Sequence, residues 1–144
     1  MKPKVLFLCT GNSCRSQMAE GLLRHLAGDR FAAESAGTKP VGLNPDAVEA
    51  MRDIGVDIAA HRSKSLDEFL GQPFEWVITV CDAAREACPI FPGAASQLHW
   101  SFEDPAAAQG SQEERQAVFA RVRDQIAARI REFIAAAGQL GCGS

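Results

Sequence analysis

The stretch Cys9-Thr10-Gly11-Asn12-Ser13-Cys14-Arg15-Ser16 decides the fold of this chain. The apolar residues 5–8 precede it and predict a buried strand, and residues 17–26 follow it with the composition of a helix. In such a strand–turn–helix unit the backbone N–H groups of the turn converge, and the helix N-terminus adds a partial positive charge. The sequence therefore predicts a cradle for a tetrahedral oxyanion.

Two residues at the ends of this loop indicate its chemistry. Cys9 is expected beneath the anion, where the helix N-terminus and Arg15 lower the pKa of its thiol and make it a nucleophile. Arg15 is expected to clamp two oxygens of the anion, and Ser16 to donate a hydrogen bond to the Cys9 sulfur. A nucleotide-binding P-loop is excluded because the Gly-Lys-Ser/Thr ending is missing. The alternative, a buried structural cysteine, does not explain the other residues at these spacings.

The remaining loop residues complete the predicted anion site. Gly11 and Asn12 are residue types that tolerate a positive φ in a tight loop. Cys14 is expected to pack rather than to react. The predicted anion-binding residues are Thr10, Gly11, Asn12, Ser13, Cys14, Arg15 and Ser16.

Composition narrows the class of protein. The chain has 144 residues, of which 47% are hydrophobic and 23% charged, as expected for one globular domain. A net charge of -3 argues against a nucleic-acid-binding surface, and no apolar run is long enough for a membrane span or a signal peptide. Five cysteines without Cys-x2-Cys pairs favour reactive thiols in a reducing cytoplasm, with no bound metal. We expect a monomer.

Strands alternate with helices along the rest of the chain. This alternation predicts a single-domain α/β sandwich of three layers, with a parallel sheet covered on both faces. Asn44 followed by Pro45 marks the start of a helix, with Asn44 as its N-cap. The domain is expected over residues 1–137 and a flexible Gly-rich tail over 138–144. The predicted strands are 5–8, 31–37, 74–80 and 96–100, and the last helix is predicted over 112–137.

Three further residues are predicted to act with the loop. Cys81 and Asp104, like Cys9, follow predicted strands, so all three are expected in one crevice at the carboxyl edge of the sheet. Cys88 lies seven positions after Cys81. With a nucleophilic Cys9 on the same edge, a thiol relay explains the pair better than two unrelated buried thiols. Asp104 is expected to protonate a departing oxygen, although an aspartate before Pro105 is also a common turn cap.

These motifs resemble a known family. The loop is similar to that shared by low-molecular-weight protein tyrosine phosphatases and thioredoxin-coupled arsenate reductases. The phosphatases usually have proline after the loop serine, whereas this chain has Gln17. The stretch 80–89 with its two cysteines resembles the reductases alone. The resemblance implies a flavodoxin-like sheet of four parallel strands, and Asp104 as the general acid.

The resemblance also implies a reaction and a partner. Cys9 attacks arsenate, Cys81 attacks Cys9 as arsenite leaves, and Cys88 attacks Cys81. Thioredoxin then reduces the final disulfide as an external electron donor, and glutaredoxin is the alternative donor. The chain itself is expected to bind no cofactor. Phosphate and sulfate are expected to compete with arsenate. A phosphatase is the alternative enzyme, and weak phosphatase activity is expected in either case, while a non-enzymatic oxyanion or redox sensor is the third possibility.

A structural potassium site is the last expectation drawn from the resemblance. Some of these reductases bind potassium through an Asn, a Glu, a Ser and an Asp. Asn12, Glu20 and Ser35 match three of these ligands, but Lys64 stands where the acidic ligand is expected. We expect the ammonium of Lys64 to replace the cation and to pair with Glu20.

Overall fold

The protein is built on one four-stranded parallel sheet. The computed structural model describes residues 2–81 and 94–142, with side chains described as far as residue 137. The strands, in the order β2-β1-β3-β4 across the sheet, all run parallel. They are β1 (Lys4–Cys9), β2 (Ala32–Gly37), β3 (Phe74–Thr79) and β4 (Ala94–His99). This arrangement confirms the predicted α/β class with one sheet of four parallel strands.

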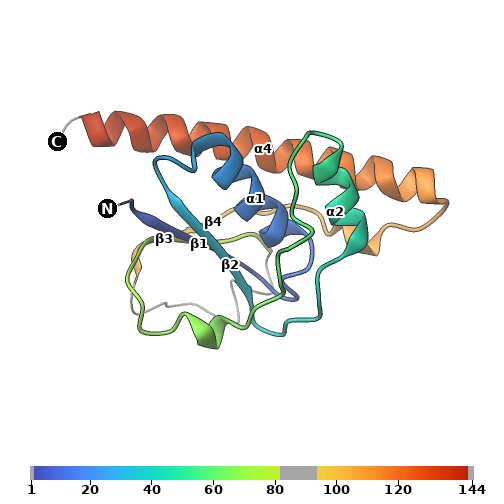
Figure 1. Cartoon of the computed structure of the whole chain (residues 1–144), viewed down its shortest axis with the longest axis horizontal. Coiled ribbons are helices and arrows are strands. Elements are labelled where there is room, and N and C mark those ends of the chain that lie inside the picture. The colour runs from blue at the N-terminus through green and yellow to red at the C-terminus, as the bar shows by residue number, and fades with distance from the viewer. Residues whose placement is uncertain (1, 82–93, 143–144) are drawn as a thin grey trace.

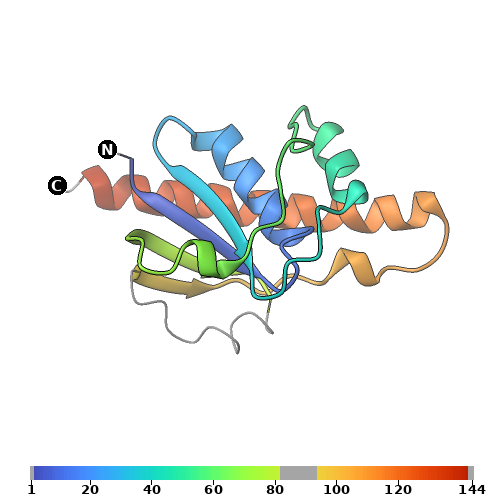
Figure 2. The ribbon, with the colours of Figure 1, turned by 60° about the horizontal axis from the view of Figure 1, so that its bottom comes forward.

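The helices of the described residues gather on one face of the sheet (Figure 1). They are α1 (Arg15–Ala27), α2 (Pro45–Arg52) and α4 (Gln112–Cys142), and two short 3-10 helices, η1 (Leu66–Glu68) and η2 (Pro105–Ala107), lie in the connections. The long α4 runs across α1 and α2 in both ribbon views (Figures 1 and 2). Asn44 caps α2 as predicted, because its side chain accepts a hydrogen bond from the Asp46 backbone N–H at 2.8 Å.

The position of β1 in the core explains why its residues 5–8 are all apolar. Residues 5–8 are fully buried, so both faces of this central strand are covered. From α4, Phe119, Ile126 and Ile130 pack into the same core. The central position of β1 places Cys9, its last residue, in the middle of the carboxyl edge of the sheet.

The sequence misplaced one boundary. The last helix was predicted to end near residue 137, but α4 continues to Cys142. A glycine inside a helix costs about 1 kcal/mol relative to alanine, which does not by itself end a helix. The presence of Gly138 and Gly141 was therefore not sufficient reason to end the helix at residue 137.

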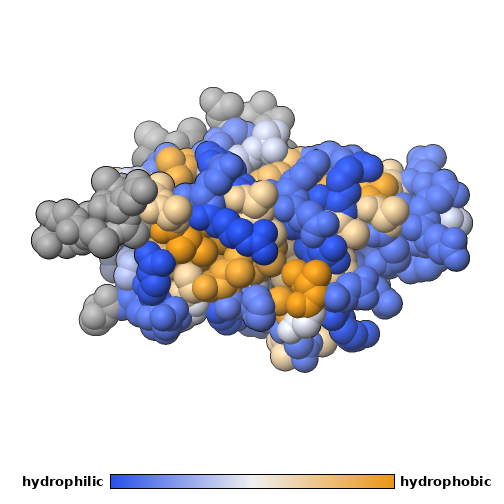
Figure 3. All heavy atoms as spheres, turned by 90° about the horizontal axis from the view of Figure 1, so that it is seen from above, coloured by the Kyte–Doolittle hydropathy of each residue, from blue (hydrophilic) through white to orange (hydrophobic). Residues whose placement is uncertain are grey.

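The helical face carries apolar and charged side chains side by side (Figure 3). A hollow of about 230 Å³ on this face includes the partly exposed Leu26 and Ile54 in its wall. No helix in the described part of the chain is both long and apolar enough to cross a membrane. A cavity of about 700 Å³ lies at the carboxyl edge of the sheet, around the loop that follows β1, and this is where the predicted site residues meet.

Candidate active site

Most residues predicted for the site line this one cavity. Its wall is formed by the loop after β1, by residues beyond β2 and β3, and by the connection between β4 and α4. The residues predicted for the site that line it are Cys9, Thr10, Gly11, Ser13, Cys14, Arg15, Cys81 and Asp104. Asn12 and Ser16 are fully buried and support the loop from behind. Cys88 lies outside the described residues.

The loop backbone is shaped by Asn12 and by close approach at two glycines. Asn12 has φ 48°, as expected for an asparagine in a tight loop. Gly11 is not among the residues with positive φ; a Cβ there would lie 2.8 Å from Cγ2 of Val41, an exposed side chain. At Gly37, a Cβ would lie 2.5 Å from the Thr10 carbonyl oxygen. The end of β2 therefore packs directly against the loop backbone.

Cys9 sits at the bottom of the cavity. Its side chain is almost fully buried, and Ser16 Oγ donates a hydrogen bond to its Sγ at 3.1 Å, as the sequence predicts. Cys81 lies beside it, since Cys81 hydrogen-bonds the Cys9 side chain and its Sγ is 3.5 Å from Thr10 Oγ1. Cys9 is the last residue of β1, and Cys81 lies two residues after the end of the adjacent strand β3.

The predicted low pKa of Cys9 is wrong for this arrangement. The hydrogen bond with Cys81 and the burial of the thiol raise the pKa of Cys9 well above its usual value, although the Ser16 hydroxyl and backbone N–H act to lower it. A thiol that donates its proton to a neighbouring sulfur is stabilised in its protonated form, and two adjacent sulfurs resist both becoming thiolates. The helix N-terminus and Arg15 were expected to lower the pKa of Cys9, but the contact of Cys9 with a second thiol was not foreseen.

Removing the Cys81 thiol is therefore expected to lower the pKa of Cys9. In Cys81→Ala the largest cause of the raised pKa is lost, so alkylation of Cys9 by iodoacetamide should begin at lower pH than in the wild type. The measurement is the alkylation rate of Cys9 against pH, followed by peptide mass. Cys14→Ala serves as control, since Cys14 is not among the groups that shift the pKa of Cys9. An unchanged or higher midpoint in Cys81→Ala would contradict the described contact.

Arg15 and Asp104 lie next to each other in the cavity wall. Arg15 Nη2 is 3.8 Å from Asp104 Oδ2, and Arg15 Nη1 donates to the Phe102 carbonyl at 3.1 Å. Asp104 Oδ1 also accepts from the Ala106 backbone N–H at 3.0 Å, so this carboxylate both caps η2 and lines the cavity. The two interpretations of Asp104, turn cap and cavity residue, are therefore compatible.

Gln17 holds the loop in place through hydrogen bonds that the sequence did not predict. Its Nε2 donates to Asn12 Oδ1 at 2.9 Å and to the Arg62 carbonyl at 2.9 Å, and its Oε1 is 3.0 Å from His61 Nδ1. The amide thus ties the loop to residues 61–64, where Ser63 Oγ also donates to the Gly11 carbonyl at 2.8 Å. Gln17 stands where the phosphatases have proline, which was the available signal. Its partners His61 and Arg62 lie more than 40 positions away in the chain, so their contact with Gln17 was not predictable.

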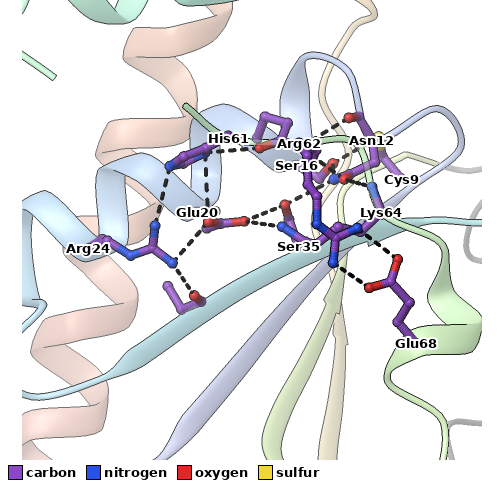
Figure 4. Close-up of polar contacts among 12 residues, drawn as sticks. Cys9, Asn12, Ser16, Glu20, Arg24, Ser35, His61, Arg62, Lys64 and Glu68 are labelled. Carbon is purple, nitrogen blue, oxygen red and sulfur yellow. Dashed lines mark hydrogen bonds and ion pairs between the residues drawn. The ribbon is translucent and has the colours of Figure 1, made fainter. Parts of the chain in front are cut away.

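A buried cluster of charges lies behind the loop, at the expected potassium position (Figure 4). Lys64 Nζ is 3.2 Å from Glu20 Oε1, which confirms the predicted pair. The Glu20 carboxylate also contacts Arg24 at 2.9 Å and accepts from Ser35 Oγ at 2.6 Å. Asn12 Nδ2 donates to Ser35 Oγ at 3.0 Å, and this connects the cluster to the loop. Within residues 2–81 and 94–137, no three His, Cys, Asp or Glu side chains are arranged to hold a metal ion.

His61 borders this cluster on its outer side. Its ring contacts Gln17, Arg24 and Glu20. Burial, as the largest cause, lowers the pKa of His61, while the Glu20 carboxylate acts in the opposite direction. Through these contacts His61 closes the outer side of the cluster.

Comparison with known proteins shows which family the chain resembles. Residues 4–140 match the family described as low molecular weight phosphotyrosine protein phosphatase. An arsenate reductase of Halalkalibacterium halodurans is 48% identical over 132 residues, which are 92% of this chain and 95% of that protein. A solved structure described as an arsenate reductase in the phosphate binding state is 32% identical with a TM-score of 0.77, over 94% of this chain and 98% of the other. A thioredoxin-dependent arsenate reductase of Corynebacterium glutamicum is 31% identical with a TM-score of 0.72, over 94% of this chain and 61% of that one.

Proposed function

We propose that this chain, which belongs to the low molecular weight phosphotyrosine protein phosphatase family, reduces arsenate to arsenite and is recycled by thioredoxin. The observation that carries the proposal is the Cys81 thiol beside Cys9 in the oxyanion cavity. Phosphoryl transfer needs one thiol, whereas reduction of arsenate needs a second thiol that reaches the first. The reaction belongs to the cytoplasm, where thiols are kept reduced.

The first step is attack on arsenic. Arsenate occupies the cradle, where Arg15 binds two of its oxygens. The proton of Cys9 passes to an oxygen of the bound arsenate, and Ser16 stabilises the resulting Cys9 thiolate. An S–As bond forms as one As–O bond breaks. Asp104 gives the proton with which that oxygen leaves as water.

The next steps move two electrons from thiols to arsenic. Cys81 attacks the Cys9 sulfur, its proton passes to an arsenic-bound oxygen, and the S–As bond breaks with its electron pair left on arsenic. Arsenite leaves, and a Cys9–Cys81 disulfide remains. Cys88 then attacks Cys81 and releases Cys9 as a thiol. The dithiol of thioredoxin reduces the Cys81–Cys88 disulfide and completes the cycle.

A coupled assay tests this proposal. With thioredoxin, thioredoxin reductase and NADPH, addition of arsenate should cause continuous NADPH oxidation, and addition of phosphate alone should cause none. Absence of arsenate turnover with thioredoxin and with glutaredoxin plus glutathione would contradict the proposed reaction. Turnover with glutaredoxin alone would contradict only the choice of thioredoxin.

Weak hydrolysis of aryl phosphates is the second proposed activity, because Asp104 lies at the cavity mouth beside Arg15. Asp104→Asn should lower kcat for p-nitrophenyl phosphate by roughly 10²- to 10⁴-fold, the usual contribution of a general acid. Asparagine can still cap η2 through its side-chain oxygen, so the fold should be retained. Steady-state hydrolysis measures this, with Glu103→Gln, at an exposed neighbouring ion pair, as control. An unchanged kcat in Asp104→Asn would exclude Asp104 as the acid.

A further inference from the structure

The thiols of Cys9, at the end of β1, and Cys81, just after β3, lie side by side in the wall of the active-site cavity. Leu8 and Thr79 are register partners in β1 and β3, and the Val80 backbone N–H donates to the Leu8 carbonyl at 2.8 Å. The next residues in each segment, Cys9 and Cys81, are therefore neighbours at the carboxyl edge, and a side-chain hydrogen bond joins them. Both thiols are buried by protein, yet both form part of the wall of the 700 Å³ cavity.

Two adjacent thiols beside an open cavity can bind an atom that prefers sulfur ligands and takes few substituents. We propose that the reduced Cys9–Cys81 pair binds trivalent arsenic as a chelating bis-thiolate. Thiolate sulfur is the soft ligand that such centres prefer. Two S–As bonds form, two As–O bonds break, and the two thiol protons leave with those oxygens as water. Arsenic stays trivalent throughout, so the step needs no oxidant or reductant.

The third substituent on arsenic faces the cavity. Cys14 is also buried in the cavity wall, but the described residues contain no group of three metal-ligating side chains, so the structure favours two sulfurs rather than three. Val41 and Phe102 give this cavity an apolar side. An organic substituent such as a phenyl ring therefore fits the third position as well as a hydroxyl does.

This binding has a consequence for the reaction. The reduced pair is the form that begins each turnover, and arsenite is the proposed product. Arsenite should therefore hold the enzyme in an inactive bis-thiolate form until another thiol removes it. This consequence depends on the proposed function, whereas the binding itself depends only on the two thiols.

Phenylarsine oxide is the probe for the site. The reduced full-length protein is incubated with it in excess 2-mercaptoethanol, which displaces arsenic held by one thiol, and the intact mass is measured. We expect one phenylarsenic adduct, with loss of two thiol protons, in the wild type and in Cys14→Ser. Cys9→Ser and Cys81→Ser should each bind about a hundredfold more weakly, since a single attachment loses the high effective concentration of the second thiol.

Peptide mapping of Cys14→Ser locates the bridge without relying on the variants that lose a ligand. Trypsin should release the peptides 5–15 and 65–85 joined through arsenic. Cys88→Ser should keep the adduct. Loss of the adduct in Cys88→Ser with retention in Cys9→Ser would place arsenic on Cys81 and Cys88 and overturn the proposal, as would loss in Cys14→Ser. No arsenate turnover is measured, so the result stands apart from that of the coupled assay.

Discussion

Cys81→Ser is expected to lower thioredoxin-coupled arsenate turnover by about 10³-fold or more, the scale seen when a group essential to a multi-residue mechanism is removed. Serine is close to cysteine in size and can still form a hydrogen bond beside Cys9, but it cannot form the disulfide that releases arsenite. Hydrolysis of p-nitrophenyl phosphate should persist, because it uses the loop, Arg15 and Asp104. The measurement is kcat for both reactions on the same preparation.

Cys142→Ser is the matched control for this prediction. It removes a thiol near the end of α4 by the same substitution and should leave both activities as in the wild type. Equal loss of both activities in Cys81→Ser would indicate damage to the loop rather than to the relay. Undiminished arsenate turnover in Cys81→Ser would exclude Cys81 from the reaction.

Lys64→Met is expected to lower the free energy of unfolding by about 3 kcal/mol, at the low end of the cost of breaking a buried ion pair. Glu20 is almost fully buried and loses one of its two close cations, while Arg24 and Ser35 still contact its carboxylate. For a chain of this size the loss corresponds to roughly 10 °C in Tm. Denaturant and thermal unfolding at pH 7 measure both quantities.

The exposed ion pair of Arg62 with Glu68 supplies the control. Arg62→Met removes a cation of similar reach at the surface, and little change in stability is expected, because exposed ion pairs contribute little. Potassium and sodium chloride should give the wild type equal stability, since Lys64 already neutralises Glu20. Unchanged stability of Lys64→Met, or a specific effect of potassium on the wild type, would contradict this role of Lys64.

The features that depend on neighbouring residues in the chain were predictable. The apolar run of β1, the Asn44–Pro45 start of α2 and the hydrogen bond from Ser16 to Cys9 follow from local spacing, and the structure has all three. The pair of Lys64 with Glu20 joins residues distant in the chain. It was predictable because a family resemblance brought these two positions together.

The features that depend on unforeseen contacts were not predictable. The pKa of Cys9 is raised by a thiol from another strand, and a helix N-terminus with one arginine does not overcome that contact. Gln17 acts through the carbonyl of Arg62 and the ring of His61, which only the fold brings near. A Cβ at Gly11 would approach the Val41 side chain, and the φ of Gly11 is not positive. In each case the decisive partner lies on a different element.

A single turnover in the absence of thioredoxin tests the relay most directly. The reduced protein is mixed with one equivalent of arsenate, quenched with acid, alkylated and mapped by peptide mass. The account predicts one arsenite formed per chain, a disulfide between Cys81 and Cys88, and Cys9 recovered as a thiol. Arsenite formed with Cys81 and Cys88 both recovered as thiols would contradict the three-cysteine relay.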